Sequence, residues 1–219
     1  MTIAIDGPAG AGKSTIARAA AQALGYTYID TGAMFRAVAL AVLRAGISPH
    51  DEAAATALLP GVVLNVRYIE GAQQVYLGGE DVSAAIRAPD VTMATSEVSK
   101  YKAVRLFLLQ KQRDLACAQD SILDGRDIGT VVLPDADIKI YLTADPKERA
   151  HRRWEEQKAK GMNDPYEKVL AEVLARDDKD MNRAEAPLRP AEDSILLDTT
   201  HMSVEESTQA LLDIIYANL

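Results

Sequence analysis

Eight residues near the start of the chain, Gly7 to Ser14, have the glycine spacing of a loop that binds phosphate. Their sequence, Gly-Pro-Ala-Gly-Ala-Gly-Lys-Ser, fits the pattern Gly-x-x-x-x-Gly-Lys-Ser/Thr. Glycines let the backbone turn its N–H groups inward, so that these groups form a concave site for an anion. Lys13 adds a positive charge for the β- and γ-phosphates, and the Ser14 hydroxyl is a ligand for Mg²⁺. The run predicts a nucleoside triphosphate site, against the plainer alternative of a Gly-rich turn.

Four other charged residues are candidates for the same site. Asp124 ends an apolar run and matches the acid that supports Mg²⁺ in phosphate-loop proteins, the alternative being a turn residue at a strand end. Arg126 and Asp127 follow on a loop expected to face the nucleotide, the alternative being an isolated salt bridge. Arg36 lies one turn into a predicted helix beside the same cleft, the alternative being a solvated charge.

Arg176, Asp180 and Arg183 form the pattern Arg-x-x-x-Asp-x-x-Arg, whose spacing puts them on one face of a helix. This face is either salt-bridged and solvent-exposed, or a clamp for an anion and a sugar. Two arginines on one face suit the neutralisation of charge on a transferred phosphoryl group. The spacing alone does not separate these interpretations. The charged helix before Gly161, which includes Lys160, is favoured as a solvent face, although its basic residues could also reach a triphosphate.

Short apolar runs that alternate with helical patterns predict a doubly wound parallel sheet. Ligands of such sheets gather beyond the carboxyl ends of the strands. The predicted strands are 3–5, 26–29, 121–124, 138–142 and 195–198, with helices from Lys13, at 33–43, from 103 to 119, from Pro146, from Pro165 and from 204 to 216. Two runs at 62–68 and 74–77 flank a turn and predict an antiparallel hairpin, so residues 60–95 are interpreted as an insert.

The composition is that of one globular domain, with 219 residues, 48% of them hydrophobic and 26% charged. The net charge of −8 argues against general binding of nucleic acid or anionic membrane. The single cysteine, Cys117, excludes an internal disulfide and is expected to be a buried spacer in a helix. No apolar run approaches membrane-spanning length, so we expect a soluble protein, and the single cysteine fits a reducing, cytoplasmic compartment. We expect a monomer because nothing in the sequence demands a larger assembly.

Four ordered motifs together resemble the bacterial cytidylate kinases, which are P-loop nucleoside monophosphate kinases. The motifs are Ile5–Ser14, Asp30–Arg36, Asp124–Thr130 and Arg176–Leu188, and the resemblance runs nearly end to end. It implies a P-loop NTPase-type α/β core with a mostly parallel five-stranded sheet flanked by helices, a small antiparallel β insert and a short lid. The single domain of residues 1–219 would comprise a core at 1–59 and 96–219, an inserted nucleoside-monophosphate-binding subdomain at 60–95 and a lid at 150–165.

The resemblance also implies an activity and a role for each site residue. The family phosphorylates CMP and dCMP from ATP with Mg²⁺, and Lys13, Arg126, Arg176 and Arg183 match its catalytic residues. Ser14 and Asp124 would hold the metal, directly or through water. The ATP-binding residues would be Gly7, Pro8, Ala9, Gly10, Ala11, Gly12, Lys13, Ser14 and Thr15. The CMP-binding residues would be Thr31, Arg36, Ser96, Arg105, Asp124, Arg126, Asp127, Arg176, Asp180 and Arg183.

Within that set, Ser96, Arg105 and Asp127 would read the cytosine, and Arg176 and Asp180 would engage the sugar. An acceptor oxygen fits cytosine because its exocyclic amine is a donor, whereas uracil presents an oxygen at the same place. Two other classes stay open. One is a phosphate-loop kinase for UMP, dTMP, AMP or a small alcohol, and the other is a nucleotide switch that binds without an acceptor.

Overall fold

The computed structural model describes residues 1–159 and 161–219, and the chain divides into two compact units. The first unit comprises Met1–Tyr28 with Gln119–Leu219, and the second comprises Ile29–Ala118. Each unit has its own hydrophobic core. Lys160, which the sequence places in the charged helix and the lid, lies outside the described residues. The expected insert of residues 60–95 falls within the second unit, while the division into core, insert and lid stays a prediction.

The first unit contains a five-stranded sheet with the strand order β2-β6-β1-β7-β8, except that Ile29 and Asp30, the last two residues of β2, are counted with the second unit. The strands are β1 (Thr2–Asp6), β2 (Thr27–Asp30), β6 (Ser121–Gly125), β7 (Ile138–Thr143) and β8 (Ile195–Asp198). β1 pairs in parallel with β6 and β7, and β7 pairs in parallel with β8, which confirms the mostly parallel sheet. The register sets Asp6 opposite Gly125, so the loops that follow β1 and β6 begin side by side.

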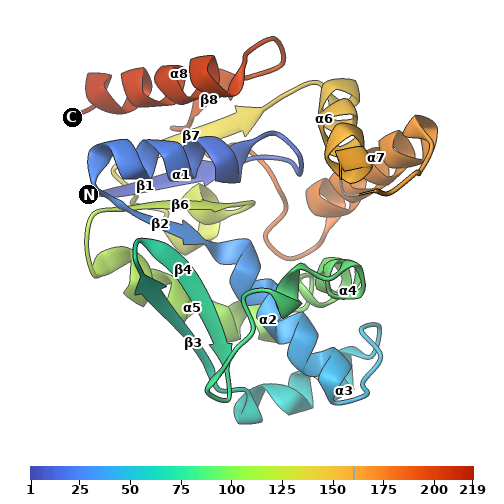
Figure 1. Cartoon of the computed structure of the whole chain (residues 1–219). Helices are drawn as coiled ribbons and strands as arrows, with labels where there is room; N and C mark the ends of the chain where they lie inside the picture. Colours follow the sequence, from blue (N-terminus) through green and yellow to red (C-terminus); the bar gives the residue numbers. More distant parts are fainter. Residues whose placement is uncertain (160) are drawn as a thin grey trace. The chain divides into compact units, whose positions relative to one another are not determined.

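Two pairs of helices belong to the first unit. They are α1 (Lys13–Leu24), α6 (Pro146–Ala159), α7 (Tyr166–Asn182) and α8 (Val204–Ala217). Figure 1 shows α1 beside α8 and α6 beside α7, and both pairs are in contact. The start of α8 is a capping box, because the Ser203 hydroxyl accepts from the Glu206 N–H and the Glu206 carboxylate accepts from the Ser203 N–H. This cap confirms the predicted start of the C-terminal helix.

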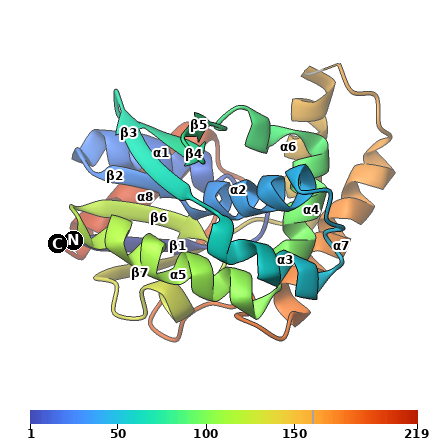
Figure 2. The same ribbon diagram turned by 90° about the horizontal axis from the view of Figure 1, so that it is seen from below.

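The second unit combines helices with a small antiparallel sheet in the order β3-β4-β5 (Figure 2). Its elements are α2 (Thr31–Arg44), α3 (Glu52–Leu58), β3 (Leu64–Ile69), β4 (Ala72–Leu77), β5 (Glu80–Asp81), α4 (Pro89–Val98) and α5 (Lys102–Cys117), with short turns η1 (Leu59–Gly61) and η2 (Ala85–Arg87). Glu70 and Gly71 join β3 to β4 with φ angles of 51° and 77°. Two successive positive φ angles are the geometry of a tight hairpin turn, so the predicted hairpin is confirmed.

Three features of the second unit differ from the sequence prediction. Helices α3 and α4 were not predicted, because their short sequences mix small and polar residues without a clear apolar stripe. Helix α2 begins at Thr31 rather than Ala33, since the Asp30 carboxylate accepts from the Ala33 N–H and caps the helix. Cys117 is exposed rather than buried, because its neighbour Ala116 takes the inward position at the end of α5.

Candidate active site

The phosphate-binding loop connects β1 to α1 in the first unit. Gly7 is required there, since a Cβ atom at this position would lie 1.9 Å from the Leu142 carbonyl oxygen. Gly12 is the N-cap of α1, with a φ of 89°, and as a glycine it has no side chain that could cap the helix. The N-terminus of α1 therefore suits a bound anion.

Lys13 is buried at the start of α1, and its Nζ atom donates to the Pro8 carbonyl oxygen at 2.7 Å. Burial is the main reason why the pKa of Lys13 lies well below its ordinary value. The positive charges of Arg126 and Arg176 lower this pKa further, while Asp124 and Asp6 act in the opposite direction. A phosphate bound at the loop would add a negative charge beside this lysine and raise its pKa.

Ser14, Asp124 and Tyr28 form a group of oxygen atoms beside the loop. The Ser14 hydroxyl donates to Asp124 Oδ2 at 2.6 Å, and the Tyr28 hydroxyl donates to Asp124 Oδ1 at 3.1 Å. Oxygen donors of this kind fit Mg²⁺, which keeps several waters and takes few ligands from the protein. A cluster of three or more His, Cys, Asp or Glu side chains that could hold a metal is not found in the described part of the chain.

The charged residues of the β6 loop and of α7 contact one another. Arg126 Nε donates to Asp180 Oδ2 at 2.9 Å, and Arg183 Nη2 donates to Asp127 Oδ1 at 3.3 Å. Burial by itself would raise the pKa of Asp180, but the positive charges of Arg126, Arg176 and Arg183 outweigh it and lower this pKa. This part of α7 is therefore engaged with the β6 loop and is not simply a solvent face. Arg183 directly follows the last residue of α7.

The second unit holds the other four predicted contacts for the acceptor nucleotide. Thr31 is the first residue of α2, and Arg36 on the same helix donates to the Thr92 hydroxyl of α4 at 3.1 Å. Ser96 lies one turn beyond Thr92 and so shares its face of α4. Arg105 donates to the Ser99 carbonyl oxygen at 2.8 Å, and its guanidinium lies 5.4 Å from the centre of the Phe35 ring. Arg36 thus links α2 to α4, and Arg105 of α5 contacts Phe35 of α2 and the residue that follows α4.

Two buried ions in the first unit were not singled out from the sequence. Asp6 accepts from the Ile128 and Gly129 N–H groups, at 2.7 Å each. Arg149 donates to the Ala9 carbonyl oxygen at 3.0 Å and to both carboxylate oxygens of Asp177, at 3.1 and 2.5 Å. Asp6 stands between the first strand and the glycine loop, within the motif Ile5–Ser14, but the motif by itself assigned it no role. Arg149 stood among many charges on a helix interpreted as a solvent face.

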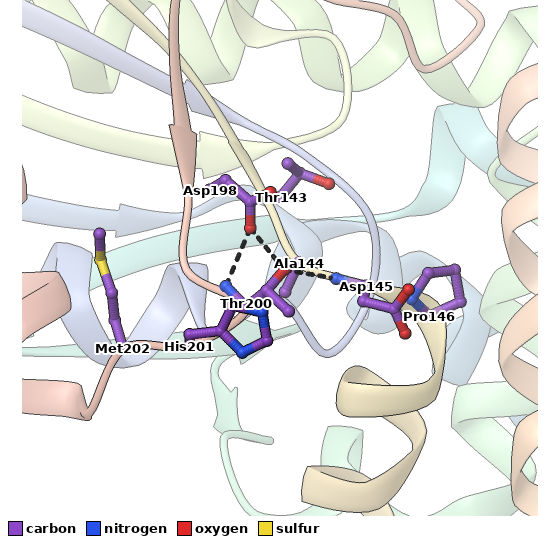
Figure 3. A pocket seen from close by; sticks show the side chains of 8 residues that line it. All are labelled: Thr143, Ala144, Asp145, Pro146, Asp198, Thr200, His201 and Met202. Atoms are coloured by element: carbon purple, nitrogen blue, oxygen red, sulfur yellow. Dashed lines mark hydrogen bonds between the residues drawn. The ribbon is translucent and has the colours of Figure 1, made fainter.

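A cavity of about 580 Å³ opens at the carboxyl ends of β7 and β8 (Figure 3). Its lining comes from two short stretches, Thr143–Pro146 and Asp198 with Thr200–Met202. The Thr200 hydroxyl donates to Asp198 Oδ1 at 2.5 Å and accepts from the Asp145 N–H at 2.9 Å. Thr199 Oγ1 lies 3.4 Å from the Ala11 carbonyl oxygen, so the cavity adjoins the phosphate-binding loop. The sequence did not predict this cavity.

The parallel sheet, the glycine loop and its buried lysine together define a nucleotide-binding protein of the P-loop class. A sequence model of the family described as "Cytidylate kinase" matches residues 3–217. The chain is 50% identical to a cytidylate kinase of Caldicellulosiruptor bescii over 99% of this chain and 96% of that protein. It is 48% identical to a cytidylate kinase of Mycobacterium leprae over 98% of this chain and 95% of that protein. The chain therefore belongs to the cytidylate kinase family and is a phosphotransferase.

A solved structure of shikimate kinase from Bacteroides thetaiotaomicron has the same fold. The TM-score is 0.51 at 12% identity, with 99% of this chain and 98% of that chain covered. At this level of identity the likeness shows the fold alone. Within residues 1–159 and 161–219, no helix is long and apolar enough to cross a membrane.

Proposed function

We propose that this protein transfers the γ-phosphoryl group of ATP to CMP or dCMP and releases ADP with CDP or dCDP. The observation that carries the proposal is the family match over residues 3–217, because a P-loop by itself fits many acceptors. In this reaction an oxygen of the CMP phosphate attacks the γ-phosphorus in line, and the bond to the bridging oxygen of ADP breaks. That phosphate oxygen is already largely ionised near neutral pH, so no general base is assigned.

The donor side of the proposal uses the first unit. Residues Gly7 to Thr15 bind the phosphates of ATP, with Lys13 as the positive charge. Ser14 and Asp124 would hold Mg²⁺, Asp124 directly or through water, and the ion would supply positive charge beside the phosphates. The cavity beside the loop is of a suitable size and place for the base of ATP.

The acceptor side uses charge and hydrogen bonding. Arg126, Arg176 and Arg183 neutralise the group in transfer, which is supported by their joint effect on Asp180. Asp127 accepts from the cytosine amine, and Asp180 engages the sugar with Arg176. The contacts of Thr31, Arg36, Ser96, Arg105 and Asp124 with CMP complete the proposed set. We propose that the lid, residues 150–165, closes around Gly161 and excludes water, which prevents hydrolysis of ATP.

The test is the release of ADP from ATP and Mg²⁺ with CMP, dCMP, UMP, dTMP and AMP offered in turn. We expect turnover mainly with CMP and dCMP. Preference for another monophosphate would keep the phosphate chemistry but overturn the acceptor. ATP binding without acceptor-dependent turnover would favour a nucleotide switch. A cytoplasmic location, a monomeric state and the absence of nucleic-acid and membrane partners stay predictions that rest on composition and net charge.

Substitution of Asp127 tests how the base is selected. We expect Asp127→Ala to lower kcat/KM for CMP by about 100-fold and to change that for UMP much less, because the lost acceptor serves only cytosine. Asp127→Asn places an N–H donor there and is expected to improve UMP relative to CMP. Asp135→Ala, an exposed position on the same connection, is the matched control and should leave both values unchanged. Equal losses for CMP and UMP would contradict the assignment.

A further inference from the structure

Asp6 is the last residue of β1 and directly precedes Gly7, the first residue of the phosphate-binding loop. Its side chain is buried, and the whole residue is only 4% exposed. Each carboxylate oxygen accepts one backbone N–H, Oδ1 from Ile128 and Oδ2 from Gly129, both at 2.7 Å. These bonds join two loops that are 122 residues apart in the sequence. Asp6 thus ties the start of the phosphate-binding loop to the segment that follows β6.

The segment held by Asp6 begins immediately after Arg126 and Asp127. Ile128 and Gly129 are the first two residues of η3, a short π-helical turn (Ile128–Val132). The Asp127 carbonyl oxygen accepts from the N–H groups of Val131 and Val132 at 2.9 and 3.1 Å, so the turn folds back on this residue. The backbone that carries Asp127 is therefore held by its own turn and, through the next two N–H groups, by Asp6.

The side chains carried by this segment are those proposed to act on CMP. Arg126 contacts Asp180, and Asp127 contacts Arg183. A shift of η3 would move the guanidinium and the carboxylate together relative to Gly7. Small displacements of positioned groups lower the rate of transfer strongly, because in-line attack needs the reacting atoms close and aligned.

The charge of Asp6 matters for this contact. A carboxylate only accepts hydrogen bonds, so it satisfies both N–H groups at once, whereas an amide presents one acceptor and one donor. The charges of Asp127 and Lys13 affect the pKa of Asp6. Tyr141 lies opposite Asp6 on the neighbouring strand β7. Burial, the largest cause, together with Asp127 raises the pKa of Asp6 to about 6, although both N–H bonds and Lys13 favour the anion.

We propose that Asp6 is a positioning residue for phosphoryl transfer, whose carboxylate holds Arg126 and Asp127 in register with the phosphate-binding loop. It acts on the acceptor nucleotide through these two side chains and touches neither substrate itself. The inference rests on the proposed function, because it assigns Arg126 and Asp127 to the acceptor.

The experiment compares Asp6→Asn with the wild type in steady-state kinetics and in direct binding of ATP. We expect kcat/KM for CMP to fall by about 10- to 100-fold, as for loss of a hydrogen bond to a charged group, with the dissociation constant of ATP changed less than about threefold. Asp137→Asn is the matched control. Its carboxylate accepts from the Thr2 N–H at 2.6 Å, at the other end of β1, and its loss should leave the kinetics unchanged.

A second readout follows the backbone. In a ¹⁵N-labelled protein, the amide protons of Ile128 and Gly129 are expected downfield because they donate to a carboxylate at short distance. In Asp6→Asn at least one of them should move upfield, while the control leaves both in place. If Asp6→Asn does not fold, Asp6→Glu takes its place. That variant keeps the charge but moves the carboxylate by one methylene, and the same loss of CMP efficiency with retained ATP binding is expected.

The outcomes separate the two proposals. A wild type without CMP-dependent turnover refutes the proposed function. An active wild type whose folded Asp6 variant keeps its kcat/KM for CMP, or loses ATP binding equally, refutes the positioning role. A selective loss of CMP efficiency with the amide shift supports it, since a merely structural carboxylate would affect both substrates alike.

Discussion

The buried carboxylate of Asp6 should make the stability of the protein depend on pH in an unusual direction. Its pKa is raised from 3.8 to about 6, chiefly by burial. The folded state therefore binds the proton more tightly than the unfolded state does. Between about pH 4 and pH 6 the folded protein carries more protons at this site, so its stability increases as the pH falls through this window and is lost as the pH rises.

The size of the effect follows from the shift. A change of about two pKa units corresponds to about 3 kcal/mol between the limits of low and high pH. Between about pH 4.5 and pH 7.5, the range in which the measurement is practical, the contribution of Asp6 to the free energy of unfolding should fall by about 2 kcal/mol. Asp6→Asn removes this titration, whatever the substitution does to stability at neutral pH.

The assay is chemical denaturation of the wild type and Asp6→Asn at several pH values across this range. Other groups titrate in both proteins, so the difference between the two unfolding free energies isolates Asp6. We expect that difference to change by about 2 kcal/mol, in favour of the wild type at the acidic end. The pKa of Asp137 is lowered, chiefly by its hydrogen bond from the Thr2 N–H, so its contribution to stability is lost only as the pH falls below about 4, and Asp137→Asn should give a difference that is nearly flat across this range. A difference that is flat with pH for Asp6→Asn would refute the reasoning.

Two further predictions concern the neighbouring cations. Because the pKa of Lys13 is lowered chiefly by burial, binding of a nucleotide phosphate at alkaline pH should be accompanied by proton uptake, measured by calorimetry in buffers of different ionisation enthalpy. Lys13→Arg should abolish this uptake, and equal uptake in both proteins would contradict the assignment. Arg149→Met should lower the free energy of unfolding by about 3–5 kcal/mol, because it leaves Asp177 buried without its partner. Adding Asp177→Leu should restore much of the loss, and Lys168→Met, which removes an exposed ion pair, should cost little.

The phosphate-binding loop and the sheet could be predicted from the sequence because both depend on local patterns. A central parallel strand such as β1 is an apolar run, and Ile3 and Ile5 are fully buried in it. Gly7 is fixed by the close approach of the β7 backbone, and the loop motif includes it for that reason. The predicted strands of this sheet differ from the observed ones by at most one residue at each end.

Helix α4 shows why other parts of the site could not be predicted. Its ten residues, Pro89–Val98, bury Val91, Ala94, Thr95 and Val98, which are all small or medium-sized, whereas the one large apolar residue, Met93, is exposed. The pattern is too weak to separate a short helix from a loop next to the hairpin. Thr92, which accepts the hydrogen bond from Arg36, was therefore not seen as a neighbour of Ser96.

The buried ions were missed for a different reason. Asp6 and Arg149 each bind backbone groups of a segment more than a hundred residues away, Asp6 at Ile128 and Gly129 and Arg149 at Ala9. A charge that is paired in the interior looks the same in a sequence as a charge in solvent, since only the fold determines what surrounds it. The two ions have opposite sign and connect the glycine loop to different elements, Asp6 to η3 and Arg149 to α7. Burying Asp6 and Arg149 is costly, but their hydrogen bonds fix the backbone around the glycine loop before a phosphate binds. A loop fixed in this way is preorganised, and preorganised groups stabilise charge most effectively.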